Sequence, residues 1–209
     1  AIFPYKQGLV LINKHFNHRL VLSLALPMIL SNISTPLLGL VDTVVLGHLD
    51  SEHFLAAVAL GGLIFSFIFW GFGFLRMGTT GLTAHAYGED DRQEVNAILT
   101  RALCLAIGIS GILLLSQQLI ASISFSLLQS EAIVESFALQ YFETRLLSAP
   151  ATLCLYVLMG WFLGQQNVKV PLLLVLSSNL VNIGLDILFV YHLNMQVQGV
   201  ALATVIAEY

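Results

Sequence analysis

The chain has 209 residues, of which 57% are hydrophobic and 10% are charged, and its mean hydropathy is +0.88. A soluble globular domain has about 25% charged residues, so a water-soluble protein of this composition could not cover its own surface. The formal net charge of −4 is confined to short segments, and no basic patch interleaved with aromatic residues indicates nucleic-acid binding. The composition predicts an integral membrane protein.

Apolar runs of membrane-spanning length follow one another along the chain. A spanning helix needs about 20 mostly apolar residues, and in lipid each run must be helical because its backbone polar groups need internal partners. Five runs are visible and a sixth begins: about 20–46, 54–75 with a helical continuation toward 87, 95–125, 137–163, 170–191, and from 197 onward. The sequence predicts an all-α, polytopic six-helix bundle.

Basic residues recur in alternate loops. Lys and Arg lie before the first run, after the second and after the fourth, at Lys6, Lys14, Arg19, Arg92 and Lys169. The other loops contain neither. Because basic residues accumulate in cytoplasmic loops, residues 1–19 are predicted to be a cytoplasmic segment, and residues 20–209 form the transmembrane domain.

Two carboxylates lie inside the apolar runs. Asp42 and Asp186 each precede the outer end of their run by about five residues, which is roughly 7 Å at 1.5 Å per residue. Ionisable residues within a membrane are costly and are functional candidates by default. We expect the two carboxylates to share one level of the outer leaflet, although both could instead cap helix ends in the headgroup layer.

Further polar groups fall at a similar depth. Asn182 and Asp186 lie on one helix face, Thr204 is about seven residues into the sixth run, and Tyr141 lies near the outer start of the fourth. Carboxylate, amide and hydroxyl oxygens suit a proton or a hard cation such as Na⁺. Two neighbouring carboxylates in a low dielectric do not both ionise easily, so they are expected to titrate as a coupled unit.

Other residues receive weaker predictions. Arg76 is expected near the cytoplasmic interface, where its side chain can snorkel. Glu143 and Arg145 are expected to have a structural role, at the outer interface or inside the fourth helix. Pro27 and Pro36 interrupt the first helix and permit a bend there, either static or part of a moving element.

Sequence motifs of enzymes are absent. The chain contains no HExxH, GxSxG, Walker A or CxxC motif, and its two cysteines lie in apolar runs without metal-ligand spacing. The sequence therefore predicts neither an enzyme nor a bound cofactor.

Several motifs follow one another along nearly the whole chain. They are Leu26-Pro27 and Leu40-Val-Asp42-Thr-Val-Val-Leu-Gly47, then Arg76-Met-Gly-Thr-Thr-Gly-Leu-Thr-Ala-His85, Arg145-Leu-Leu-Ser-Ala-Pro150, Asn179-Leu-Val-Asn182-Ile-Gly-Leu-Asp186 and Gln198-Gly-Val-Ala-Leu-Ala-Thr204. In sequence and order they resemble the multidrug and toxic compound extrusion (MATE) family, and most closely its DinF-like branch. His85 stands where the usual motif has Gln.

The resemblance implies a two-lobe, twelve-helix secondary transporter of the plasma (inner) membrane. Family members exchange Na⁺ or H⁺ for organic, often cationic, drugs, and in this branch the ion site lies in the N-terminal lobe. The family's site residues match Asp42, Tyr141, Asn182, Asp186 and Thr204. Na⁺ ligation is expected from the same set without Tyr141. The chain would be the N-terminal lobe, with the second lobe of the same polypeptide and membrane lipid as its partners.

Two other functions stay open. A lipid-linked precursor flippase of similar architecture would place several basic residues in its cavity to meet phosphates, whereas only Arg76 and Arg145 approach membrane depth here. A non-transporting structural or channel subunit would not need a coupled carboxylate pair. The coupling ion, Na⁺ or H⁺, is not decided by the residues because carboxylates serve both.

Overall fold

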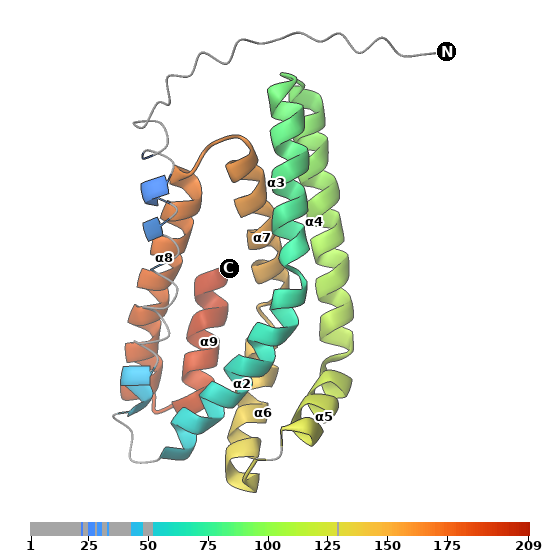
Figure 1. Cartoon of the computed structure of the whole chain (residues 1–209). Coiled ribbons are helices and arrows are strands. Elements are labelled where there is room, and N and C mark those ends of the chain that lie inside the picture. The colour runs from blue at the N-terminus through green and yellow to red at the C-terminus, as the bar shows by residue number, and fades with distance from the viewer. Residues whose placement is uncertain are drawn as a thin grey trace.

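The computed structural model describes residues 52–128 and 130–209 and, before them, residues 22, 25–27, 29–30, 33 and 43–47. These parts of the chain contain helices and no strand. The helices are α2 (Glu52–Gly71), α3 (Gly73–Gly88), α4 (Arg92–Leu115), α5 (Gln117–Leu127), α6 (Ala132–Leu146), α7 (Ala149–Gly164), α8 (Lys169–Asp186), the π-helix η1 (Ile187–His192) and α9 (Gln196–Glu208). They run up and down as a bundle, and α9 rises through its middle (Figure 1).

Most of the predicted spans are present. Within the described residues, three helices are long and apolar enough to cross a membrane: Glu52–Gly88, Arg92–Leu115 and Lys169–His192. α6 and α7 make a fourth if the bent pair counts as one span. The predicted first run lies mostly outside the described residues, as do Pro36 and Asp42, whereas Pro27 is helical and half-buried. The sixth run corresponds to α9, which has 13 residues.

The fourth span is not one straight helix. α6 and α7 meet at an angle of 53°, and Pro150 occupies the first turn of α7. Proline lacks an N–H donor and its ring collides with the carbonyl four residues earlier, so a helix begins at this position more readily than it passes through it. The bend between Leu146 and Ala149 was not part of the sequence prediction, and it positions the polar cluster described below.

Glycines let neighbouring helices approach closely. A Cβ atom on Gly160 would lie 2.5 Å from the carbonyl oxygen of Arg76, and one on Gly164 would lie 2.6 Å from Cβ of Thr83. α3 and α7 therefore pack backbone to backbone at these two positions. Gly61 of α2 has the same role against Tyr141 of α6, whose Cδ1 would be 2.6 Å from the added Cβ. Small residues at such contacts are typical of membrane helix packing.

Large apolar side chains also cover much of the outer surface. Phe67 and Trp70 of α2, Met77 of α3 and Leu115 of α4 are all at least three-quarters exposed. A soluble protein rarely exposes so much apolar area, whereas lipid solvates it. The buried core lies between α2, α4, α6 and α7 and includes Phe142 and Leu153.

Candidate ion site and cavity

Asp186 is the last residue of α8 and is fully buried. The next residue begins η1, where the helix widens to a π-helix. Short π-helical segments within α-helices occur frequently at functional sites because they rotate the side chains that follow. Burying a carboxylate in a membrane helix is expensive, so this position agrees with the functional reading of the sequence.

Asn182 connects this carboxylate to α9. With its amide nitrogen toward Asp186, the nitrogen donates to Oδ2 at 3.0 Å, and the amide oxygen accepts from the backbone N–H and the Oγ1 of Thr204, each at 3.1 Å. In this orientation every polar atom of the amide that faces a partner is matched, acceptor to donor. Asn182 therefore joins the Asp186 carboxylate to the Thr204 hydroxyl and backbone.

Tyr141 lies in an apolar cluster next to this group. The cluster contains Val190 of η1 and Val200 and Ala201 of α9, and Val200 is one helical turn before Thr204. Val45 and Leu46, from the end of the first predicted span, belong to the same cluster. The Tyr191 hydroxyl also donates to the carbonyl oxygen of Val45 at 3.1 Å. The chain just after Asp42 is thus held against the helices that carry Asp186 and Thr204.

The structure describes five of the seven predicted site and hinge residues. Asn182, Asp186 and Thr204 are brought together across α8 and α9, as predicted. Tyr141 of α6 is buried in the apolar cluster that also contains Val200, one helical turn before Thr204. Asp42 lies outside the described residues, so its distance from Asp186 stays a prediction. Of the two predicted hinges, Pro27 is described as helical and Pro36 is not described.

A cavity of about 540 Å³ opens beside this group, and Asn182 and Thr204 form part of its wall. Residues from α2, α3, α6, α7, α8 and α9 line it, with a wall of aromatic and aliphatic side chains that includes Phe69 and Tyr156. Ligand cavities are typically about 300–1,000 Å³ and largely apolar with a few convergent polar groups. This cavity has a volume in that range, and its wall is largely apolar with a few polar side chains.

An ion pair that the sequence did not predict lies on the same wall. Arg145, at the end of α6, donates from Nη2 to Oε1 of Glu208 on α9 at 2.6 Å, and the two side chains are only 10% and 14% exposed. Ser148 accepts from the same guanidinium, and Thr152 donates to the carboxylate. The guanidinium also lies 4.0 Å from the centre of the Phe65 ring. Ser148 lies in the bend between α6 and α7 and Thr152 in the first turn of α7, so the bend builds this cluster.

Arg76 also lines the cavity, on α3, where its side chain is half-buried. Its backbone is level with Gly160, four residues before the end of α7, which places it about 6 Å from that end. Its expected position near the cytoplasmic interface stays a prediction. The sequence did not predict that the residue would border the same cavity as Asn182.

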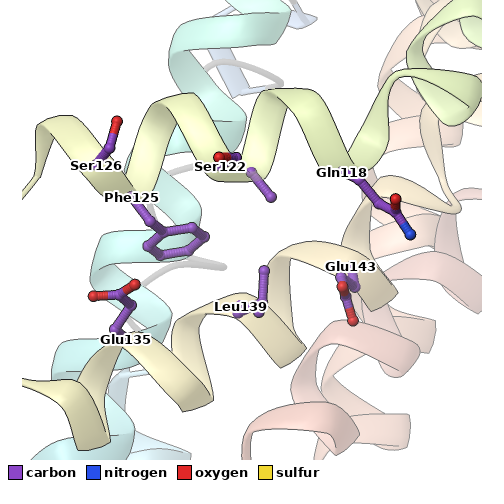
Figure 2. A pocket seen from close by; sticks show the side chains of 8 residues that line it. Gln118, Ser122, Phe125, Ser126, Glu135, Leu139 and Glu143 are labelled. Carbon is purple, nitrogen blue, oxygen red and sulfur yellow. The ribbon is translucent and has the colours of Figure 1, made fainter.

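Glu143 faces a different hollow. A groove of about 560 Å³ between α5 and α6 is lined by Glu135, Leu139 and Glu143 from α6 and by Gln118 and Phe125 from α5. Figure 2 shows the two carboxylates at opposite ends of this groove, on either side of Leu139. Within the described part of the chain, only α5 and α6 contribute to it, and the described ion-site residues Tyr141, Asn182, Asp186 and Thr204 do not. Glu143 and Arg145, two residues apart, therefore serve different surfaces.

Comparisons with known proteins agree with this architecture. A family model described as MatE matches residues 27–188. DNA damage-inducible protein F of Escherichia coli (strain K12) is 50% identical over 187 residues, which cover 89% of this chain and 40% of that protein. The probable multidrug resistance protein NorM of Thermotoga maritima is 25% identical over 194 residues, which cover 90% of this chain and 41% of that protein.

Solved structures show the same fold. The structure titled "Crystal structure of MATE in the straight conformation" superposes with a TM-score of 0.83 at 23% identity, covering 91% of this chain and 42% of that one. The chain thus spans about 40% of the length of the relatives it matches. Because the family model covers most of its residues and the Escherichia coli relative is 50% identical, the chain belongs to the MATE family of membrane transporters, in its DinF-like branch.

Proposed function

We propose that the protein is an ion-coupled antiporter that exports organic compounds across the inner membrane, and that this chain supplies the lobe with the ion site. The observation that carries the proposal is the fully buried Asp186, joined through Asn182 to Thr204 on the wall of a cavity of ligand size. A structural role alone gives little reason to keep a carboxylate at this depth. The names of relatives, which include multidrug resistance proteins, support organic compounds as the exported substrates.

In this proposal the coupling ion, H⁺ or Na⁺, binds at Asp186. Asn182 and Thr204 contribute neutral oxygens, Asp42 contributes the second carboxylate, and Tyr141 shapes the site. The contacts of the Asn182 amide with Asp186 Oδ2 and with Thr204 support the assignment, because they hold three oxygen-bearing side chains together. Oxygen donors of this kind fit both a hard cation and a shared proton.

Ion binding then biases the shape of the first helix. Pro27 and Pro36 weaken that helix, and its end packs through Val45 and Leu46 against the cluster around Tyr141. An ion that binds more tightly to one arrangement of these contacts shifts the protein toward that arrangement. We propose that bending at Pro27 opens or closes the cavity to the exported compound.

The test is transport by the full-length protein in sealed vesicles, with Na⁺ and H⁺ gradients imposed separately. Efflux of a fluorescent organic substrate that follows only one of the two gradients identifies the coupling ion. Vesicles without the protein, and vesicles in which the gradient is collapsed by an ionophore, are the controls. Efflux that is independent of both gradients would contradict the proposal.

A further inference from the structure

Three charged side chains line the cavity among the described residues, and two of them are arginines. Arg145 is compensated by Glu208, with which it forms an ion pair at 2.6 Å. No acidic residue within the described parts of the chain forms an ion pair with Arg76. The cavity wall described here therefore carries one positive charge in excess, at Arg76.

The uncompensated charge lies toward one end of the cavity. Arg76 is level with Gly160 on α7, whereas Arg145 and its partners meet α7 at Thr152, eight residues earlier and about 12 Å away along the helix. Tyr156, which also lines the cavity, lies on α7 between these two levels. The cavity is thus lined by a balanced ion pair at the level of Thr152 and by a second arginine at the level of Gly160, near the end of α7.

An apolar surface separates the polar groups. Phe69 of α2, with Leu155 and Met159 of α7, contributes to the wall between the two arginines, next to Tyr156. Flat aromatic and flexible thioether side chains accept apolar bodies of varied shape. A guanidinium binds carboxylate and phosphate oxygens through paired N–H donors. Together they match a molecule with an apolar body and an anionic head.

We propose that the cavity of this lobe binds amphipathic organic anions, with their carboxylate or phosphate head at Arg76 and their apolar body against Phe69 and Met159. The proposal rests on the proposed transport function and names the substrate class that this lobe accepts. A snorkelling Arg76 that only meets lipid headgroups would serve anchoring instead, and it would not discriminate among ligands of the cavity. The two roles differ in ligand affinity and can be separated by measurement.

The experiment uses four probes with one apolar body: pyrenebutyrate, pyrenebutyl phosphate, pyrenebutanol and pyrenebutyl-trimethylammonium. Each is titrated into the full-length protein in nanodiscs of uncharged lipid, and binding is measured by fluorescence against empty nanodiscs. The wild-type protein is compared with Arg76→Gln, with Arg76→Lys and with Arg92→Gln. Arg92 is an exposed arginine at the start of α4, outside the cavity, so Arg92→Gln is the matched control.

Wild-type protein is expected to bind the two anionic probes about 10- to 100-fold more tightly than the alcohol, because a hydrogen-bonded charged group contributes about 1.5–3 kcal/mol. Arg76→Gln should remove this preference, Arg76→Lys should restore part of it, and Arg92→Gln should leave it unchanged. A stronger response to the carboxylate indicates a free organic acid, and a stronger response to the phosphate indicates a phosphorylated lipid or metabolite.

Two results would overturn the inference: wild-type protein that prefers the trimethylammonium probe, or Arg76→Gln that binds pyrenebutyrate within about twofold of wild type. Neither result depends on an ion gradient. Failure of the proposed transport function is seen separately, as loss of gradient dependence in vesicles. The two proposals can therefore fail independently.

Discussion

Two arginine–glutamate pairs of nearly equal length lie in very different surroundings. Arg101 and Glu94, both on α4, meet at 2.8 Å, and their side chains are 70% and 43% exposed. Arg145 and Glu208, on α6 and α9, meet at 2.6 Å and are 10% and 14% exposed. The first pair joins two residues of one helix. The second joins residues of two different helices that are 63 positions apart in the chain.

Bond length therefore says little about what each pair does. Glu94 and Arg101 lie in the first ten residues of α4, where we expect water and salt to screen their charges, and such pairs typically contribute about 0–1 kcal/mol. The buried pair has left water, so each charge depends on the other and on Ser148 and Thr152 for compensation. The contrast predicts that charged residues of the cavity wall cannot be changed singly without consequence, whereas those of α4 can.

The largest effect on transport is expected at Asp186, a buried carboxylate whose partner is the amide of Asn182 and not a guanidinium. Asp186→Asn keeps the shape of the side chain and removes its titratable charge. We expect the full-length variant to insert and fold but to lose gradient-driven efflux entirely, and we expect the same for Asp42→Asn. Expression, size-exclusion profile and vesicle transport measure this. Wild-type efflux by both variants would indicate that these carboxylates have a structural role.

The second effect separates the two arginine–glutamate pairs directly. Arg145→Met leaves Glu208 charged and uncompensated, and breaking a buried pair in this way typically costs about 3–5 kcal/mol. The double variant Arg145→Met/Glu208→Met removes both charges and should recover most of that loss. Thermal unfolding of the purified full-length variants measures both. A double variant as unstable as the single one would show that the loss comes from packing and not from the unpaired charge.

The sequence predicted the polar group of Asn182, Asp186 and Thr204 but did not predict the Arg145–Glu208 pair, and the difference has a physical reason. Asn182 and Asp186 lie four residues apart on one helix, and a helical repeat brings such residues to one face without knowledge of the fold. Thr204 was added from its depth alone, and depth can be counted along a spanning helix. These inferences require only that each run is helical.

The Arg145–Glu208 pair requires more than helical periodicity. Arg145 was left between an interfacial and an interior position, and Glu208 was not considered. Their contact depends on the bend before Pro150 and on the packing of α9 against α6, neither of which appears in hydropathy. The same limit applies to Arg76, whose place on the cavity wall was not predicted. Rotation of a helix about its axis is set by tertiary packing.

A third and smaller effect is expected at Thr204. Thr204→Ala removes a neutral ligand and the hydrogen bond to Asn182 but leaves the Asp186 charge in place. A hydrogen bond between neutral groups contributes about 0.5–1.5 kcal/mol, so the half-saturating concentration of the coupling ion should rise about 2- to 10-fold. Vesicle transport at graded ion concentrations measures this. Thr204→Ser, which keeps the hydroxyl, is the control and should stay close to wild type.

The smallest effect is expected at the exposed pair. Arg101→Gln removes a guanidinium that bonds Glu94 on the surface of α4, away from the cavity. Because water solvates the remaining carboxylate, we expect a stability loss of about 0–1 kcal/mol and unchanged transport.

Salt gives an independent check on this last prediction. At about 1 M salt the Debye length falls to roughly 3 Å, so the difference between wild type and Arg101→Gln should shrink toward zero. The loss in Arg145→Met should persist in larger part under the same conditions, since the two side chains of this pair are only 10% and 14% exposed and salt screens them less. Thermal unfolding of both variants at low and high salt measures the two responses side by side. If salt reduced both losses equally, burial would not be what distinguishes the two pairs, and the comparison between them would fail.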